Sequence, residues 1–198
     1  MIRARNDAAR IALTVLAARA LPAIRAVLVL EAGSTDSTRR VAADSGAVLL
    51  HDEAELAGYA PLPLLFVDAG RGPAVEEAFV LLAPVAAGAA DAAVAVGTGR
   101  GDAAARREQR GLARAGFTAA GVLTGEFCVS SAAFAATRPP AGGAGALTGM
   151  IIDLMRAGPK VVPVALEAPR AQPGRGLRGR REVSRALRGR RTVPVIDR

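Results

Sequence analysis

The chain has 198 residues, of which 51% are hydrophobic and 22% charged, and this composition indicates a globular domain with a core rather than a disordered chain. One cysteine excludes an internal disulfide framework, and one histidine excludes a metal site built from several histidines. The net charge of +8 comes from residues 170–198, which hold ten arginines and two acids, so the high isoelectric point describes that end and not the body of the chain.

Short apolar runs alternate with helical patterns along the body of the chain. The apolar runs predict strands at 26–31, 47–50, 64–68, 92–97 and 161–166. The helical patterns predict helices at 6–20, from the 33–38 turn to about Ser45, at 74–87, 103–124 and 145–157, and near 181–188. Strands that alternate with helices predict an α/β fold with a mostly parallel sheet and flanking helices, and Pro163 indicates an edge strand.

Two turns follow predicted strands, and ligands of parallel sheets bind beyond the carboxyl ends of the strands. The first turn, GSTDST at 33–38, holds Ser34 and Asp36, which can cap the following helix, and capping is compatible with a nearby phosphate. The second turn begins at Asp68, whose carboxylate either belongs to a ligand cleft or caps the helix that starts at Pro73. Both interpretations stay open for each turn.

Several segments resemble family 2 glycosyltransferases, in the order that this family has them. They are ARNDAARI (4–11), LVLEAGSTDSTRRVAADSGA (28–47), LLFVDAGRGP (64–73), GLARAGF, LTGEF and MIIDLMRAGPKVVPVAL (150–166). The last three resemble the acceptor half of bacterial members. The resemblance implies a GT-A fold with a Rossmann-like sheet, in a single domain at 1–169 that an arginine-rich tail at 170–198 follows.

The resemblance also implies an activity: transfer of a sugar from a nucleotide-sugar donor to a hydroxyl or phosphate-bearing acceptor, including a lipid-linked one. A divalent cation, Mg²⁺ or Mn²⁺, would neutralise the donor diphosphate and assist its departure. By their places in the motifs and the tail, the residues expected to bind the donor are Arg5, Asn6, Glu31, Ser34, Asp36, Asp68, Arg175 and Arg178. Asp68 is also the expected metal ligand, while Arg5 and Asn6 have the alternative role of starting a helix.

The sequence departs from the family's pattern at positions that carry chemistry. The second acid of the nucleoside motif, the second acid of the metal motif, the acceptor base and the late histidine stand here as Ala32, Gly70, Leu147 and Pro169. Only residues 1–3 precede the ARN segment, where the family has a central strand, so we expect either that the start is misassigned or truncated and this strand is lost, or that the sheet is rebuilt. These departures keep a catalytically inactive GT-A binding or regulatory protein as an alternative, with a nucleotidyltransferase on a similar fold as a second one.

The remaining predictions concern the cellular location of the protein and the partners of the arginine-rich tail at 170–198. No secretory signal or spanning segment is recognisable, which predicts a cytoplasmic protein that can contact a membrane surface. The arginines at 170–198 fit a solvated end, or binding to an anionic membrane surface or a lipid-phosphate acceptor. Nucleic acid is the least favoured partner, because the tail has no aromatic residue for base stacking.

Overall fold

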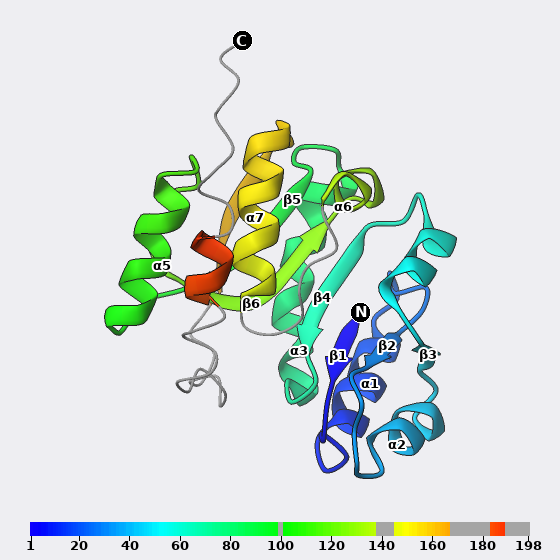
Figure 1. Ribbon diagram of the computed structural model, residues 1–198. Coiled ribbons are helices and arrows are strands. Elements are labelled where there is room, and N and C mark those ends of the chain that lie inside the picture. The colour runs from blue at the N-terminus through cyan, green and yellow to red at the C-terminus, as the bar shows by residue number, and fades with distance from the viewer. Residues whose placement is uncertain (99–100, 138–144, 167–182, 189–198) are drawn as a thin grey trace.

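The computed structural model describes residues 1–98, 101–137, 145–166 and 183–188. Seven strands of this part form one sheet in the order β3-β2-β1-β4-β6-β5-β7 (Figure 1). The strands are β1 (Ile2–Ala4), β2 (Leu28–Glu31), β3 (Val48–Leu50), β4 (Leu64–Asp68), β5 (Ala92–Gly97), β6 (Val122–Val129) and β7 (Val161–Leu166). All pairs are parallel except those of β6, which runs antiparallel to β4 and β5. The predicted mostly parallel sheet is therefore confirmed, and β7 with Pro163 is an edge strand as expected.

Strand β1 is retained, which corrects the expectation that the central strand is lost. Its three residues lie between β2 and β4, with Ile2 opposite Val29 on one side and Val67 on the other. Ile2 and Ala4 are fully or almost fully buried beneath the helices of one face. A strand that is paired on both sides needs few residues, because its neighbours satisfy its backbone groups.

Strand β6 corrects the predicted helix at 103–124. The helix there, α5 (Ala103–Ala113), ends early, and the chain reverses before Val122. The pattern of β6 misleads because Gly125 and the buried carboxylate of Glu126 interrupt its apolar run. Burial of an acid in a strand depends on partners from elsewhere in the fold, which periodicity does not reveal.

Helices cover both faces of the sheet. One face carries α1 (Ile11–Ala20), α2 (Thr38–Asp44), α3 (Val75–Ala78), α4 (Leu82–Ala86) and the short 3-10 turns η2 (Gly72–Ala74) and η3 (Phe79–Leu81). The other face carries η1 (Glu53–Tyr59), α5, α6 (Ser131–Ala136) and α7 (Ala146–Ala157). Two apolar cores result, one on each side of the sheet, and the fold has three layers.

Two more predicted helices and one predicted loop differ from the structure. The predicted helix at 6–20 begins only at Ile11, because residues 6–10 form a turn in which Asn6 has a φ of 56°. The predicted helix at 74–87 is divided into η2, α3, η3 and α4, since Pro84 cannot donate the backbone hydrogen bond of a continuous helix. The predicted loop at 51–63 contains η1, which Asp52 caps by accepting the N–H groups of Ala54 and Glu55.

Part of the arginine-rich segment packs on the domain. Residues 183–188 form a helix, as expected near 181–188, with Val183 buried and Leu187 against Gly111 of α5 (red in Figure 1). Arg175, Arg178 and the predicted boundary after residue 169 lie outside the described residues, so the division into domain and tail stays a prediction. None of the helices in the described ranges is long and apolar enough to cross a membrane.

Candidate functional site

The carboxyl ends of β1, β2 and β4 meet at one edge of the sheet. In the parallel pairing Ala4 lies opposite Glu31, and Arg3 lies opposite Asp68. The turns that follow β1 and β2 are bonded to each other: the Asn6 N–H donates to Ser34 Oγ at 3.0 Å, and the Thr35 N–H donates to Asn6 Oδ1 at 2.9 Å. Asparagine tolerates the left-handed backbone that this contact requires. The structure thus brings Asn6, Glu31, Ser34 and Asp68 to a single edge, which we call the strand-end edge.

Two carboxylates hold the turns of this edge in place. Glu31 accepts the backbone N–H of Ser34. The pKa of Glu31 is lowered, chiefly by a hydrogen bond with the Ser34 side chain and to a smaller extent by the backbone N–H groups of Ser34 and Gly33 and the charge of Arg39. Asp36 accepts the N–H of Thr38, the first residue of α2, at 3.0 Å and the N–H of Ala8 at 3.2 Å. A hydrogen bond from the Thr38 hydroxyl is the main cause of the lowered pKa of Asp36. Both groups are therefore anionic near neutral pH, and Asp36, one residue before the N-cap Ser37, satisfies the first N–H of α2.

The turn after β4 is also fixed by side chains. Asp68 is exposed, and its Oδ1 accepts the backbone N–H of Gly70 at 2.8 Å. Behind it the buried Thr14 of α1 donates its hydroxyl to the Ala69 carbonyl at 2.8 Å and accepts the Gly72 N–H at 2.7 Å. The turn is thus attached to α1, and the carboxylate of Asp68 is held at the strand-end edge.

An ion pair between Asp7 and Arg10 lies at the same edge, and it was not predicted from the sequence. The almost buried Asp7 carboxylate binds the Arg10 guanidinium and accepts the Arg5 N–H at 3.0 Å, while the Asp7 N–H donates to Thr38 Oγ1 at 2.8 Å. Half of the Arg10 side-chain surface is exposed. No local pattern marks this arginine, because its place depends on how α1 packs beside β4.

The residues of the edge do not fit the divalent metal that the resemblance implies. Mg²⁺ and related ions take several oxygen ligands, and carboxylates are the usual protein ones. In the described ranges no three His, Cys, Asp or Glu side chains form a metal-binding group. Beside Asp68 the second position is Gly70, and a Cβ there would lie 3.0 Å from Nη1 of Arg10 and 3.3 Å from Oδ1 of Asp68. One carboxylate next to a guanidinium is a poor site for a second positive charge.

Two further positions, Leu147 at the expected place of the acceptor base and the buried acid Glu126, are not part of the strand-end edge. Leu147, which stands where the family has its base, is buried in α7 within the core. Glu126 of β6 is 2% exposed, binds the Thr124 hydroxyl, and has Oε1 at 3.5 Å from Nε of Arg71. Arg71 also donates to Glu77 at 2.8 Å, so the pair connects β6 to the turn after β4. LTGEF contains Glu126, but nothing in the sequence indicated its partner Arg71.

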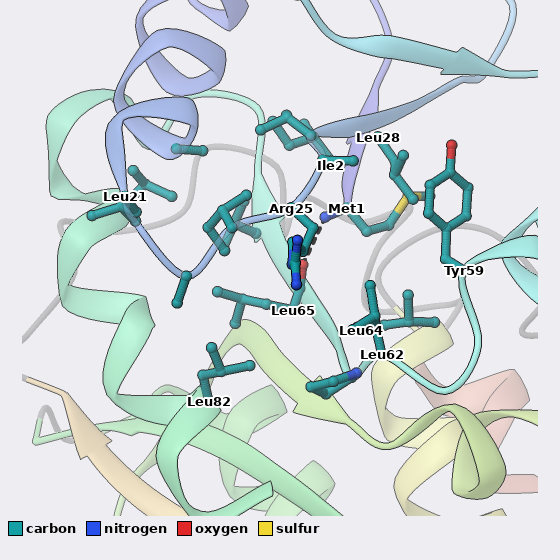
Figure 2. Close-up of a pocket in the computed structure, with 18 residues that line it drawn as sticks. Met1, Ile2, Leu21, Arg25, Leu28, Tyr59, Leu62, Leu64, Leu65 and Leu82 are labelled. Atoms are coloured by element: carbon teal, nitrogen blue, oxygen red, sulfur yellow. Dashed lines mark hydrogen bonds between the residues drawn. The ribbon is translucent and has the colours of Figure 1, made fainter. Parts of the chain in front are cut away.

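Two hollows lie away from the strand-end edge. The first is an apolar pocket at the opposite, amino ends of β1 and β4, where the Met1 amino group donates to the Leu65 carbonyl at 2.8 Å among leucine side chains (Figure 2). The second is a groove between α5 and the start of β6, where Arg106 and Arg110 stand near a Gln109 side chain that donates to the Gly121 carbonyl at 2.7 Å. Neither hollow contains a residue of the predicted donor site.

Comparison with known proteins defines the fold. No protein-family model matches this sequence, and no curated protein matches it. Solved structures of one enzyme, glucosyl-3-phosphoglycerate synthase from Mycobacterium tuberculosis, are similar along 98% of this chain.

The complex of that enzyme with Mn²⁺, uridine diphosphate (UDP) and phosphoglyceric acid has a TM-score of 0.74 at 21% identity and is covered over 78% of its chain. The complex with Mg²⁺ and UDP has a TM-score of 0.73 at 22% identity, with the same 78% covered. The complex with phosphoglyceric acid has a TM-score of 0.72 at 22% identity, with 79% covered. The chain therefore has the GT-A fold of glycosyltransferases, and the predicted fold is confirmed.

Proposed function

We propose that this protein binds a nucleotide-sugar at the strand-end edge and transfers the sugar to a hydroxyl or phosphate-bearing acceptor. The observation that carries the proposal is the bonded set of Asn6, Glu31 and Ser34 beside Asp68, drawn from three strand ends. The similar structures support it, since they hold UDP, UDP-glucose and phosphoglyceric acid. A nucleoside diphosphate-sugar and a phosphate-bearing acceptor are therefore the ligands to test first.

Each residue has a proposed role that its contacts allow. Glu31, anionic and half-buried, would accept hydrogen bonds from the nucleoside, and Asp68 would accept those of the ribose hydroxyls. Asn6, Ser34 and Asp36 would hold the two turns in a shape that admits the donor. The donor's negative charge calls for cations, and the proposed ones are Arg5, Arg175 and Arg178. The last two lie outside the described residues, as do most arginines proposed to contact an anionic membrane surface or a lipid-linked acceptor.

A second candidate function is donor binding without catalysis. The specific observation that favours it is Leu147, an apolar side chain buried in the core at the position of the expected acceptor base. General-base catalysis requires a group that can accept the acceptor's proton. A binding or regulatory protein would need the strand-end edge and no such base.

Sugar transfer is tested with a panel of UDP- and GDP-sugars, each mixed with phosphoglyceric acid or other phosphate-bearing acceptors, and products are detected by mass spectrometry. We expect a glycosylated product with the wild-type protein, and a rate at least about tenfold lower with Asp68→Asn, because a ligand of the donor is lost. The matched control is Asp44→Asn on α2, whose carboxylate is exposed and away from the edge. Donor binding without product supports the second candidate, and the absence of both contradicts the proposal.

A further inference from the structure

We infer that Arg10 replaces a divalent cation at the strand-end edge, so that the diphosphate of the donor is neutralised by its guanidinium and donor binding needs no metal. This inference rests on the proposed function, because it names how that same site compensates the charge of its ligand. The residues of the edge do not fit a metal, and the group that occupies the neighbouring space is a cation of this chain.

The position of Arg10 is defined by three neighbours. It is the residue immediately before α1, its guanidinium is bonded to Asp7, and its Nη1 lies 3.0 Å from the point where a Cβ at position 70 would stand. The same point is 3.3 Å from Oδ1 of Asp68. Nη1 of Arg10 and Oδ1 of Asp68 therefore both border the space above Gly70, so one ligand that entered this space could contact the guanidinium and the carboxylate.

The guanidinium has donors to offer a diphosphate. The Asp7 carboxylate binds Nη2, on one edge of the guanidinium. The Asp7 side chain is 11% exposed, whereas the Arg10 side chain is 50% exposed. A guanidinium carries five N–H donors in a planar fork that matches phosphate oxygens two at a time. The amino end of α1 begins at the next residue, and the positive end of the helix dipole adds to the potential there. The Asp7 carboxylate orients the fork and leaves its other edge for a ligand.

The charges of the edge explain why glycine stands at position 70. A carboxylate there would begin 3.0 Å from Nη1 of Arg10 and would pair with it. It would then compete with the phosphate oxygens for the same donors. With glycine the guanidinium stays available, and position 70 supplies no carboxylate beside Asp68 to complete a metal site. The glycine at position 70 and the guanidinium of Arg10 therefore act together, since the glycine leaves the guanidinium free to bind a phosphate.

Calorimetric titration of UDP into protein freed of metal with EDTA tests the inference. We expect binding in EDTA, a change of less than about twofold when Mn²⁺ is added, and affinity at least about tenfold lower in Arg10→Gln, because a charged donor to phosphate is lost. Arg40→Gln is the matched control, since Arg40 pairs with Asp44 at 3.6 Å on the exposed side of α2. It should bind UDP as the wild type does.

Two further variants keep the result interpretable if Arg10→Gln folds poorly. Arg10→Lys keeps the charge and should lose only part of the affinity, and Gly70→Asp should weaken metal-free binding by pairing with Arg10. Thermal melts of each variant show whether it is folded. Wild-type binding that appears only with Mn²⁺ and is unchanged in Arg10→Gln overturns the inference and leaves the proposed donor site standing. No binding under either condition by folded protein overturns both.

Discussion

A Cβ at position 70 would lie 3.0 Å from Nη1 of Arg10, so the backbone of Gly70 and the guanidinium of Arg10 occupy adjoining space at the end of β4. This contact joins the turn after β4 to the start of α1. It also places a positive charge at the same turn as Asp68, since the same Cβ position is 3.3 Å from Oδ1 of Asp68. This close approach is made by two residues that are distant in sequence.

Gly70→Ala should leave stability nearly unchanged and weaken donor binding. The φ of Gly70 is not in the left-handed region, and the nearest atoms belong to the flexible end of Arg10, which can move aside. We expect a change in unfolding free energy within about 0.5 kcal/mol in urea denaturation, with UDP affinity reduced severalfold. Gly58→Ala in η1 is the control, since a Cβ at position 58 meets nothing within 4 Å. Unchanged affinity in Gly70→Ala would count against a role for Arg10.

Asp7→Ala should destabilise the protein by about 2 kcal/mol, since it removes two charge-assisted hydrogen bonds from a nearly buried site. The Arg10 guanidinium would lose its partner at the same time. Urea denaturation followed by circular dichroism measures the loss. Asp44→Ala, which removes an exposed partner of Arg40 at 3.6 Å, should cost less than about 0.5 kcal/mol. Equal costs for the two variants would contradict the structural role given to Asp7.

Thr14→Val should lower stability by about 2 kcal/mol although valine has nearly the same shape. The Thr14 hydroxyl is fully buried and bonds both the Ala69 carbonyl and the Gly72 N–H, and valine would leave these two backbone groups unsatisfied. The exposed Thr98 gives a matched control in Thr98→Val, which should be close to neutral. Because Thr14 positions the turn that carries Asp68, the affinity for the donor should fall in Thr14→Val, although none of the proposed donor-binding residues is changed.

The stability contributed by Glu31 should be lost only in acid. Its pKa in the folded protein is below the ordinary value of 4.5, chiefly through the hydrogen bond with Ser34. The folded state therefore binds fewer protons than the unfolded state near and below that value. The contribution is complete above about pH 5 and decreases as the pH falls through the lowered pKa. Melting temperatures from pH 7 down to about pH 3 should drop more steeply for wild type than for Glu31→Gln. Parallel curves would show that the bond adds nothing.

Much of the fold was predictable because most of its strands are short continuous apolar runs, and the one at 92–97 is buried on both faces. Continuous apolar runs such as 64–68 and 92–97 carry that signal in their composition, and both are strands of the sheet. β1 escaped prediction because three residues are too few for a pattern, and β6 because Glu126 interrupts it. In both cases the pairing partners, and not the local sequence, stabilise the strand.

The shared position of the candidate site residues was predictable, because the carboxyl ends of neighbouring parallel strands lie at one edge of the sheet. Asn6, Glu31, Ser34 and Asp68 follow strands that are parallel neighbours, so they share one edge as the alternation of strands and helices predicts. Arg10 could not be found in this way, because its contact with Gly70 depends on the packing of α1 against the turn after β4. The expected metal at Asp68 stays a prediction, since the sequence shows the acid missing at Gly70 but not the arginine near it.

The most direct test of the account is a nitrogen-15 NMR titration of the labelled protein with UDP, which maps binding residue by residue. Backbone signals of Asn6, Gly33, Ser34 and Gly70 should shift first, because these groups line the strand-end edge. Signals of Leu28 and Leu64 in the apolar pocket, at the other end of the strands, should stay in place. Shifts confined to that pocket or to the groove beside α5, or no shifts in a folded protein, would contradict a donor site at the strand-end edge.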